Sequence, residues 1–435
     1  MNNQQMVAWF RHSAPYINAH RGKTFVLMLG GEAVGHPNFV NTIHDIALLN
    51  SLGVRLVLAV GARPQIENQL ALMGLDARFH QGLRVTDKAM LEVVKQAMGS
   101  VRCEVEALLS TGLANSPMHG AGIRVVSGNF VTAKPIGVRD GVDFQHTGEV
   151  RKIDKQSIHI ALQHGRVVLL PCVGYSATGE MFNLSVEDVA TKAAMALGAD
   201  KIIAFTEKAG VENEKGSLLK ELKPGDCASL LNNPCLDNNQ RNSIRACYNA
   251  VQNGVHRAHL ISYANDGALL EELFTRDGSG TLITQMHYEQ IREAVIDDIG
   301  GILELIEPLE QEGILVRRSR ERLEAEIEHF TVIERDGTIL ACMAMYPSAD
   351  KQTAEVACVA THPDYRNGSR ASVLLHAVEQ KAREMGLLSL FVLTTQTAHW
   401  FLEKGFEEEG IDALPVERKA LYNFQRNSKV FFKRL

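Results

Sequence analysis

A chain of 435 residues, with 45% hydrophobic and 22% charged residues, has the composition of a folded protein but exceeds the length that one hydrophobic core usually supports. We therefore expect two or more domains. The formal net charge of -6 gives no excess of lysine and arginine for a phosphate backbone, so no nucleic acid partner is expected.

Cysteine and histidine usage argues against disulfide and metal sites. The seven cysteines contain no C-x-x-C pair, which favours reduced thiols and a cytoplasmic protein. The sixteen histidines form no H-E-x-x-H or similar cluster, so no metal is predicted. The first residues lack a basic leader, and no later run of about 18 apolar residues could span a bilayer. We expect neither secretion nor membrane insertion.

The first part of the chain alternates short β-branched runs with longer helical patterns. This alternation predicts a mostly parallel sheet covered by helices. The predicted strands cover residues 24–29, 55–60, 166–170, 201–205 and 259–262, and the predicted helices cover 39–52, 64–73, 186–197 and 243–253. Gly30, Gly31 and Gly61 directly follow strands, at the edge where open α/β sheets bind ligands.

The pattern changes near residue 285, which we take as the domain boundary, giving domains 1–285 and 286–435. A helical stretch over 287–312 opens the second domain. Asp336-Gly337 is a two-residue turn that predicts a hairpin. The remaining predicted elements are a strand over 354–360, a helix over 372–385, a strand over 387–393 and a helix over 398–404. Together they predict a second α/β domain with a mixed sheet.

The segment VACVATHPDYRNGSRASVLL, residues 356–375, resembles the pyrophosphate-binding motif of the GNAT family of N-acetyltransferases. Small residues let backbone N–H groups approach a phosphate, and a helix N-terminus adds unpaired donors and a positive dipole end. Ser369 replaces a glycine that is usual in the family. The alternative is a helix cap beside two solvated arginines. The resemblance implies acetyl-CoA as co-substrate, bound by residues Arg366, Asn367, Gly368, Ser369, Arg370, Ala371 and Ser372.

Acetyl transfer to an amine requires a base for the ammonium proton and donors for the developing oxyanion. In the family, two neighbouring parallel strands part at a bulge and admit the acetyl arm. The resemblance therefore implies that Cys358, Val359 and Ala360 meet the acetyl group. Glu355, on the same strand, is our candidate general base, and a strand-edge glutamate in water is the alternative.

Many relatives carry a tyrosine in the last helix that protonates the departing thiolate. Phe401 occupies that position here, so this acid is missing. Thr394, Thr395 or water could take its place.

The first domain resembles the amino acid kinase family over about residues 20–285, through F-V-L-M-L-G-G and F-N-L-S-V-E-D-V-A-T-K-A-A-M-A-L-G. The family uses two lysines to neutralise charge on the transferred phosphoryl group. This chain has Met28 and Ser243 at those positions. Loss of two cations removes most of the electrostatic catalysis, so we interpret the domain as a former kinase kept for regulation and assembly.

The two domains in this order resemble the bacterial N-acetylglutamate synthase family. The resemblance implies transfer of an acetyl group to L-glutamate, the first step of arginine biosynthesis. A dicarboxylic acceptor needs cationic forks, for which Arg317 and Arg426 are the candidates, together with Leu315 and Cys358. Arg318 is the alternative to Arg317, and a solvated arginine-rich run is the alternative to both.

The resemblance also implies feedback inhibition by L-arginine and a homo-oligomer, with a hexamer as the candidate assembly. A helix over 4–19 precedes the first strand, and Pro15 should kink or end it. The expected arginine site has Glu272 for the guanidinium and backbone donors around Gly278 and Gly280 for the carboxylate. Lys208 or Tyr16 would close it. The alternative is an oligomer contact followed by an ordinary glycine-rich loop.

Three other functions remain open. The chain could acetylate another amine while its first domain senses an amino acid. It could be an active kinase with an inert second domain, against which Met28 and Ser243 argue. It could also bind arginine as a regulator without turnover.

Overall fold

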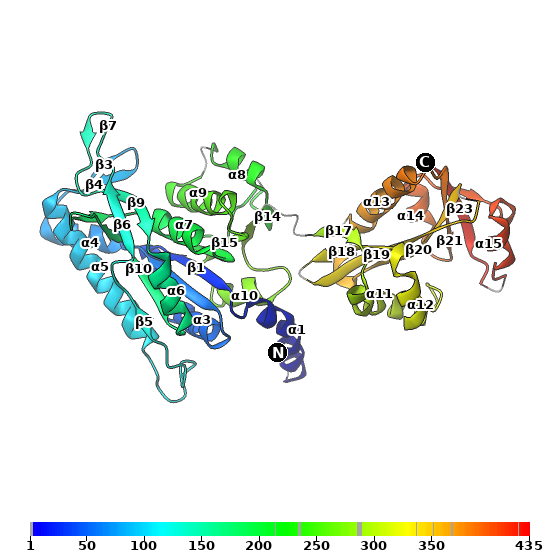
Figure 1. Ribbon diagram of the computed structural model, residues 1–435, viewed down its shortest axis with the longest axis horizontal. Helices are drawn as coiled ribbons and strands as arrows, with labels where there is room; N and C mark the ends of the chain where they lie inside the picture. The colour runs from blue at the N-terminus through cyan, green and yellow to red at the C-terminus, as the bar shows by residue number, and fades with distance from the viewer. Residues whose placement is uncertain are drawn as a thin grey trace. The chain divides into compact units, whose positions relative to one another are not determined.

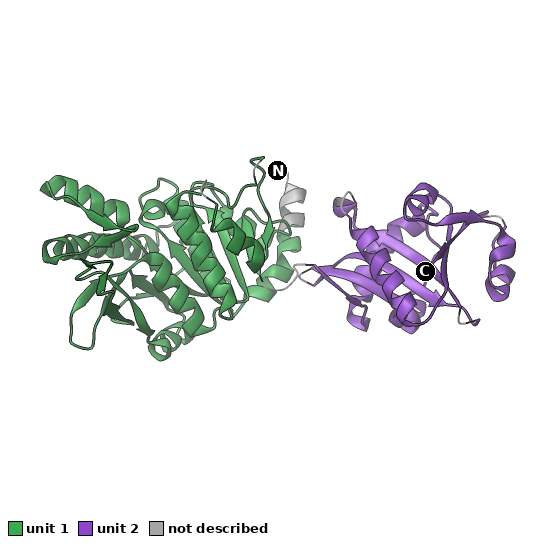
Figure 2. Ribbon diagram, turned by 90° about the horizontal axis from the view of Figure 1, so that it is seen from above, with its two compact units in different colours: residues 1–286 green, residues 287–435 purple. Residues whose placement is uncertain are grey.

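The computed structural model describes residues 3–213, 215–233, 236–284, 289–335, 337–350, 352–366, 369–424 and 426–435. The chain divides into two compact units, Met1–Met286 and His287–Leu435, drawn in green and purple in Figure 2. The domain boundary expected near residue 285 lies in 285–288, outside the described residues. Each unit has its own sheet and its own buried clusters.

Unit 1 is built on an eight-stranded sheet with the order β14-β16-β15-β13-β1-β2-β10-β5 (Figure 1). Its central strands pair in parallel, as the alternating pattern predicted. Only β16 runs antiparallel to its neighbour β15 among the described pairs. The strands are β1 (Thr24–Leu29), β2 (Arg55–Val60), β5 (Val125–Val126), β10 (Val167–Pro171), β13 (Lys201–Thr206), β14 (Glu221–Leu222), β15 (Arg257–Ser262) and β16 (Thr281–Thr284).

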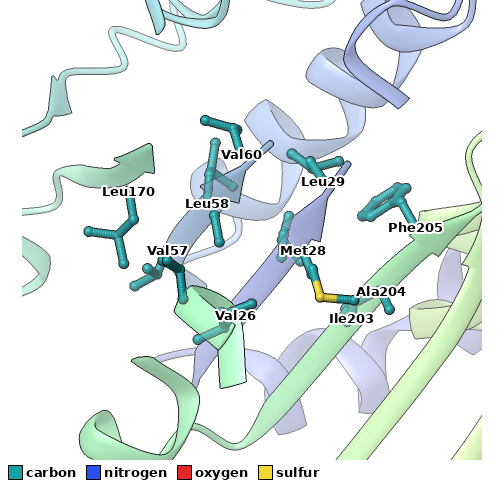
Figure 3. Close-up of a cluster of buried hydrophobic side chains, with 14 of the residues drawn as sticks. Val26, Met28, Leu29, Val57, Leu58, Val60, Leu170, Ile203, Ala204 and Phe205 are labelled. Carbon is teal, nitrogen blue, oxygen red and sulfur yellow. The ribbon is translucent and has the colours of Figure 1, made fainter. Parts of the chain in front are cut away.

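The centre of this sheet is buried on both faces, which explains why its strands are continuous apolar runs. Figure 3 shows side chains of β1, β2, β10 and β13 packed together, with Met28 among them. The covering helices include α3 (Phe39–Ser51), α4 (Arg63–Met73), α5 (Lys88–Leu109), α6 (Lys155–Gln163), α7 (Val186–Leu197) and α9 (Asn238–Gln252).

Helix α9 begins five residues before the predicted start at 243. The Asp237 side chain caps it by accepting a hydrogen bond from the Gln240 N–H at 2.7 Å. The sequence also failed to predict α5 and a second sheet, ordered β12-β11-β6-β9. Its strands are β6 (Val131–Pro135), β9 (Gly148–Ile153), β11 (Val173–Tyr175) and β12 (Met181–Asn183), and two of them have only three residues.

Two helices lie at the ends of unit 1. Helix α1 (Asn3–His20) runs through Pro15, so of the two outcomes expected for Pro15, a kink or an end of the helix, the helix does not end there. His20, its last residue, is buried and its ring Nε2 lies 2.8 Å from the Leu273 carbonyl of α10 (Ala268–Phe274). The ring also packs edge-on against Phe25 and Phe274. Helix α1 is therefore attached to the sheet through its C-terminal end.

Unit 2 has a seven-stranded sheet with the order β17-β18-β19-β20-β21-β23-β22. The pair β20 and β21 is parallel and the other pairs are antiparallel, so the sheet is mixed as predicted. The strands are β17 (Gln290–Glu293), β18 (Phe330–Arg335), β19 (Thr338–Pro347), β20 (Thr353–Thr361), β21 (Ser389–Thr394), β22 (Glu407–Glu409) and β23 (Lys429–Arg434). The helices are α11 (Ile299–Gln311), α12 (Arg320–Glu326), α13 (Arg370–Glu384), α14 (Ala398–Glu403) and α15 (Val416–Ala420).

The predicted helix over 287–312 is wrong in its first part. Residues 290–293 form β17 and pair antiparallel with β18, and the helix starts at Ile299. Pairing with the edge of the sheet overrides the local helical pattern there. The hairpin predicted at Asp336-Gly337 joins β18 and β19, with Asp336 itself outside the described residues.

Candidate functional site

The main feature of unit 2 is the place where β20 and β21 separate. The two strands pair in parallel only over Thr353–Glu355 and Ser389–Phe391, although both continue beyond that point. The ladder between β19 and β20 shifts register between Cys342 and Ala344, which marks a bulge. The parallel pairing of β20 and β21 therefore ends at Glu355, three residues before Cys358.

Cys358 lies at the bulge and has φ = 51°, in the left-handed region that non-glycine residues rarely adopt. Its side chain is buried, and its carbonyl accepts a 3.5 Å contact from the Cys342 thiol. Burial raises the pKa of the Cys358 thiol to about 11, against an opposing effect of Arg318. The thiol is therefore neutral, and what Cys358 offers the opening is backbone geometry.

Glu355, the candidate base, is bound by an arginine that the sequence did not point to. Arg418 of α15 donates from Nε to Glu355 Oε2 at 2.6 Å and from Nη2 to Oε1 at 3.0 Å. Both side chains are mostly covered, with 28% of Arg418 and 17% of Glu355 exposed. The alternative of a strand-edge glutamate in open water is therefore excluded for this conformation.

The arginine-rich segment after α11 separates into an exposed and an inward-facing residue. Arg317 is exposed and has no hydrogen bond to the described part of the chain, whereas Arg318 is half-buried. Arg318 donates from Nη1 to the Val316 carbonyl at 3.1 Å, and its buried Nε has no partner among the described residues. Leu315 precedes the pair and packs against the cluster that contains Cys358.

Arg426 lies against the same segment. Its Nη2 donates to the carbonyls of Gly313 and Ile314, while its buried Nε has no partner in the described ranges. Burial and the neighbouring Arg318 both lower the pKa of Arg426. Two guanidinium groups that repel each other and retain unused N–H donors favour an anion between them.

Tyr346 and Glu326 stand beside Arg318. The Tyr346 hydroxyl donates to Glu326 at 2.8 Å, and burial together with this hydrogen bond raises the pKa of Tyr346. Neither residue stands out in the sequence, because Tyr346 lies in the apolar run of β19 and Glu326 lies in the charged run of α12.

The start of α13 is the proposed phosphate site. Ser369 is its N-cap and makes no side-chain cap bond, so N–H groups of the first turn, including Ala371 and Ser372, remain available. Arg366 is exposed, and Asn367 and Gly368 lie outside the described residues. Arg370 points elsewhere. Its guanidinium is paired with Glu289 and lies 4.7 Å from the centre of the Tyr365 ring. The expected second phosphate cation is thus engaged within the protein.

Phe401 is buried and packs edge-on against Trp400 and Phe406. The Phe401 side chain has no proton to donate to a thiolate. Thr394, at the end of β21, shares a 2.9 Å hydrogen bond with Thr397, and Thr395 is exposed.

Unit 1 holds a cavity of about 770 Å³ at the carboxyl edge of its parallel strands. Met28, Gly30, Gly31, Gly61 and Ser243 all line it, so the two substituted lysine positions do face one pocket. Met28 is 2% exposed and Ser243 is 8% exposed. Lys208 also lines this cavity and is paired with Glu212 at 2.9 Å.

Glu272 forms a separate buried cluster. Its Oε1 is 2.6 Å from Nδ1 of His259, and its Oε2 accepts from the N–H groups of Ser279 and Gly280, both at 2.7 Å. His259 in turn contacts the Lys201 ammonium at 3.5 Å. Burial and then Lys201 lower the pKa of His259. Burial raises the pKa of Glu272, but the His259 and backbone hydrogen bonds outweigh it and the pKa is lowered.

This cluster corrects two expectations for the arginine site. The Gly280 N–H serves Glu272 itself and is not free for a ligand carboxylate. Lys208, which was expected to close the arginine site, lines the cavity of unit 1 instead. The lysine near Glu272 is Lys201, which contacts His259. A glycine is needed at position 278 for two reasons. The backbone has φ = 59°, which strains other residues, and an added Cβ would lie 2.5 Å from Glu272 Oε2. Tyr16 is half-buried against the core of unit 1.

Each of the two units matches a different protein family. Residues 23–262 match the amino acid kinase family, and residues 299–406 match the acetyltransferase (GNAT) family. The chain is 57% identical to an amino-acid acetyltransferase from Azotobacter vinelandii over 429 residues, which is 99% of each chain. The chain belongs to the amino-acid acetyltransferase family.

Solved structures similar to this amino-acid acetyltransferase include two of N-acetylglutamate synthase from Neisseria gonorrhoeae, 38% identical over 99% of both chains. The structure complexed with coenzyme A and L-arginine matches with a TM-score of 0.89, and the one complexed with coenzyme A and N-acetyl-glutamate with 0.63.

No group of three His, Cys, Asp or Glu side chains that could hold a metal ion occurs in the described ranges. None of the described helices is long and apolar enough to cross a membrane.

Proposed function

We propose that unit 2 transfers the acetyl group of acetyl-CoA to the α-amino group of L-glutamate. The separation of β20 and β21 directly after Glu355 carries this proposal. The similar enzyme from Neisseria gonorrhoeae, solved with coenzyme A and with N-acetyl-glutamate, supports the donor and the acceptor.

The chemistry follows from the opening. Glu355 takes one proton from the α-ammonium, and the resulting amine attacks the thioester carbon. The nitrogen then gives up a second proton to water or to a threonine hydroxyl, and the C–S bond breaks to leave the amide and the thiolate. Backbone groups of Cys358, Val359 and Ala360 meet the acetyl arm. With Phe401 in place of an acid, water or the hydroxyl of Thr394 or Thr395 supplies the proton that the thiolate takes.

The first turn of α13 binds the coenzyme pyrophosphate. Unpaired N–H groups and the helix dipole attract the phosphates there, and the exposed Arg366 adds a cation. Arg370, held by Glu289, supports the loop through Tyr365.

The side-chain carboxylate of glutamate binds at the arginines after α11. Arg426 and Leu315 lie at this segment, and Arg317 offers an exposed guanidinium. The unused Nε donors of Arg318 and Arg426 favour Arg318 as the inner partner of that carboxylate.

Glu355→Gln tests the proposed base. We expect kcat to fall by about a hundredfold or more, because an amide cannot accept the proton, while acetyl-CoA binding persists. Glu409→Gln, at an exposed position on β22, is the control and should keep normal turnover. Unchanged turnover in Glu355→Gln would remove this residue from the mechanism.

Unit 1 serves regulation and assembly. Met28 and Ser243 leave its cavity without the two lysines of a phosphoryl-transfer site. We also propose a homo-oligomer in the cytoplasm, with a hexamer as the assembly to test by light scattering on the full chain.

L-arginine inhibits acetyl transfer by binding beside the Glu272 cluster. The arginine-bound relative supports this, as do α1 and α10 in contact through His20. Because Glu272 is satisfied internally, arginine has to bind a conformation in which one of its partners has moved, and such differential binding is what a feedback effect needs.

Inhibition curves for the intact chain, for a chain starting at Arg21 and for Glu272→Gln test the arginine site. The shortened chain and the variant should need more than about tenfold higher arginine for half inhibition. Equal sensitivity in all three would place the site elsewhere.

A further inference from the structure

Arg418 and Glu355 form an ion pair at the opening of the sheet that the proposed mechanism leaves unused. The two residues are 63 positions apart in the chain, so the contact is made by the fold and not by local sequence. In the described part of the chain, Arg418 is the cation within hydrogen-bond distance of Glu355. We propose that Arg418 binds the α-carboxylate of the acceptor and thereby selects amino acids over other amines.

The acceptor's own chemistry supports this assignment, which rests on the proposed function. In an α-amino acid the carboxylate and the amine are attached to the same carbon. A base that takes the ammonium proton therefore has the α-carboxylate within a few ångströms. Two carboxylates at that separation repel each other unless a cation lies beside both. Arg418 is in that position.

The guanidinium has room for a second carboxylate. Nε and Nη2 are bound to Glu355, whereas Nη1 has only a 3.5 Å contact with the Leu421 carbonyl. The edge formed by Nη1 and Nη2 can hold the α-carboxylate with two parallel hydrogen bonds. The Arg418 side chain keeps 28% of its surface exposed, and Val416 and Leu421, close to it along the chain, are 86% and 74% exposed.

Occupation of Arg418 by the acceptor also prepares Glu355 for its role. While both carboxylate oxygens face the guanidinium, protonating Glu355 leaves Arg418 without its counter-charge. The α-carboxylate supplies a new counter-charge at the moment when the ammonium arrives. Proton transfer is thus favoured with an α-amino acid bound and disfavoured with a plain amine.

The other two arginines face a different end of the acceptor. Arg426 donates to carbonyls of the segment after α11, and Arg318 lies beside Tyr346. They suit the side-chain carboxylate. The pair L-isoglutamine and L-glutamine separates the two ends, because each replaces one carboxylate of glutamate by a neutral amide of the same shape.

The experiment measures kcat/KM for glutamate, isoglutamine and glutamine with the parent enzyme, Arg418→Gln, Arg418→Lys and Arg320→Gln. Arg320 is a matched control, since it is 72% exposed and its pairing with Glu324 stays within α12. We expect the parent to prefer glutamate over isoglutamine by at least about a hundredfold, as a site built for a charged group rejects its neutral analogue.

In Arg418→Gln that preference should fall to about tenfold or less, through a higher KM for glutamate, while the glutamate-to-glutamine ratio and the KM for acetyl-CoA stay within about twofold. Arg418→Lys should recover part of the preference, because lysine keeps the charge but not the fork. An unchanged glutamate-to-isoglutamine ratio in Arg418→Gln would overturn the assignment and leave the proposed function intact. A parent enzyme that does not acetylate glutamate would overturn the proposed function itself.

Discussion

Replacement of Glu272 by alanine tests whether the cluster in unit 1 is a structural element as well as a candidate regulatory site. The side chain is 5% exposed and accepts hydrogen bonds from the N–H groups of Ser279 and Gly280, both at 2.7 Å, and from His259 at 2.6 Å. Alanine leaves these three donors without an acceptor. Each unsatisfied buried donor costs about 1–3 kcal/mol, so we expect a loss of roughly 3–5 kcal/mol in the free energy of unfolding of unit 1.

The assay is urea unfolding of the full chain, followed by hydrogen exchange in peptides that cover 257–284. Glu271→Ala is the control, because Glu271 precedes Glu272 on α10 and is exposed. The control should lose less than about 1 kcal/mol. Glu272→Gln should lie between the two variants, since its amide oxygen can still accept the backbone bonds. Equal stability of Glu272→Ala and Glu271→Ala would refute the reasoning.

Three further predictions concern pH, phosphoryl transfer and coenzyme binding. Because the folded-state pKa of His259 is lowered, its contribution to stability is complete above the unfolded value of about 6.5 and decreases below it, by at most about 1.4 kcal/mol per pH unit. Thermal unfolding of unit 1 between pH 7 and pH 5 measures this loss, which His259→Asn should abolish. With Met28 and Ser243 in its cavity, the enzyme should form no phosphorylated product from ATP with acetylglutamate or glutamate, and product above the no-enzyme background would contradict the former-kinase interpretation. Arg366→Ala should raise the KM for acetyl-CoA about three- to tenfold without changing the KM for glutamate. Arg370→Ala should raise it less than Arg366→Ala does, because Arg370 is already paired with Glu289.

The central strands of unit 1 could be predicted from sequence because burial on both faces makes each a continuous apolar run. The predicted strands 24–29 and 55–60 match β1 and β2 to the residue. Between residues 74 and 165 no element was predicted. That region contains the two-residue strand β5, which is too short to show a period of two and whose pairing partner β10 lies about forty residues further along the chain. Strand β17 was taken for helix for the same reason, since its pairing with β18 is not visible locally.

The candidate site likewise contains residues that are close together in the sequence and residues that only the fold brings together. Glu355, the bulge near Cys358 and the first turn of α13 follow each other within one segment of sequence, so a motif could identify them together. Arg418 lies in the five-residue helix α15, and only the fold brings it to Glu355. Arg370 illustrates the opposite error. The motif predicts that Arg370 binds a phosphate. In the structure the Arg370 guanidinium is already bound by Glu289, the residue directly before β17.

Acetylation of the α-amino group of L-glutamate is the proposed activity on which the site assignments depend. The direct measurement is thiol release from acetyl-CoA by the full chain with each of the twenty amino acids, a polyamine and a lysine-containing peptide, with the acetylated product identified by mass spectrometry. We expect glutamate to be the preferred acceptor and N-acetyl-L-glutamate to be the product. Turnover on the peptide or the polyamine without turnover on glutamate would contradict the claim and identify an acetyltransferase for another amine.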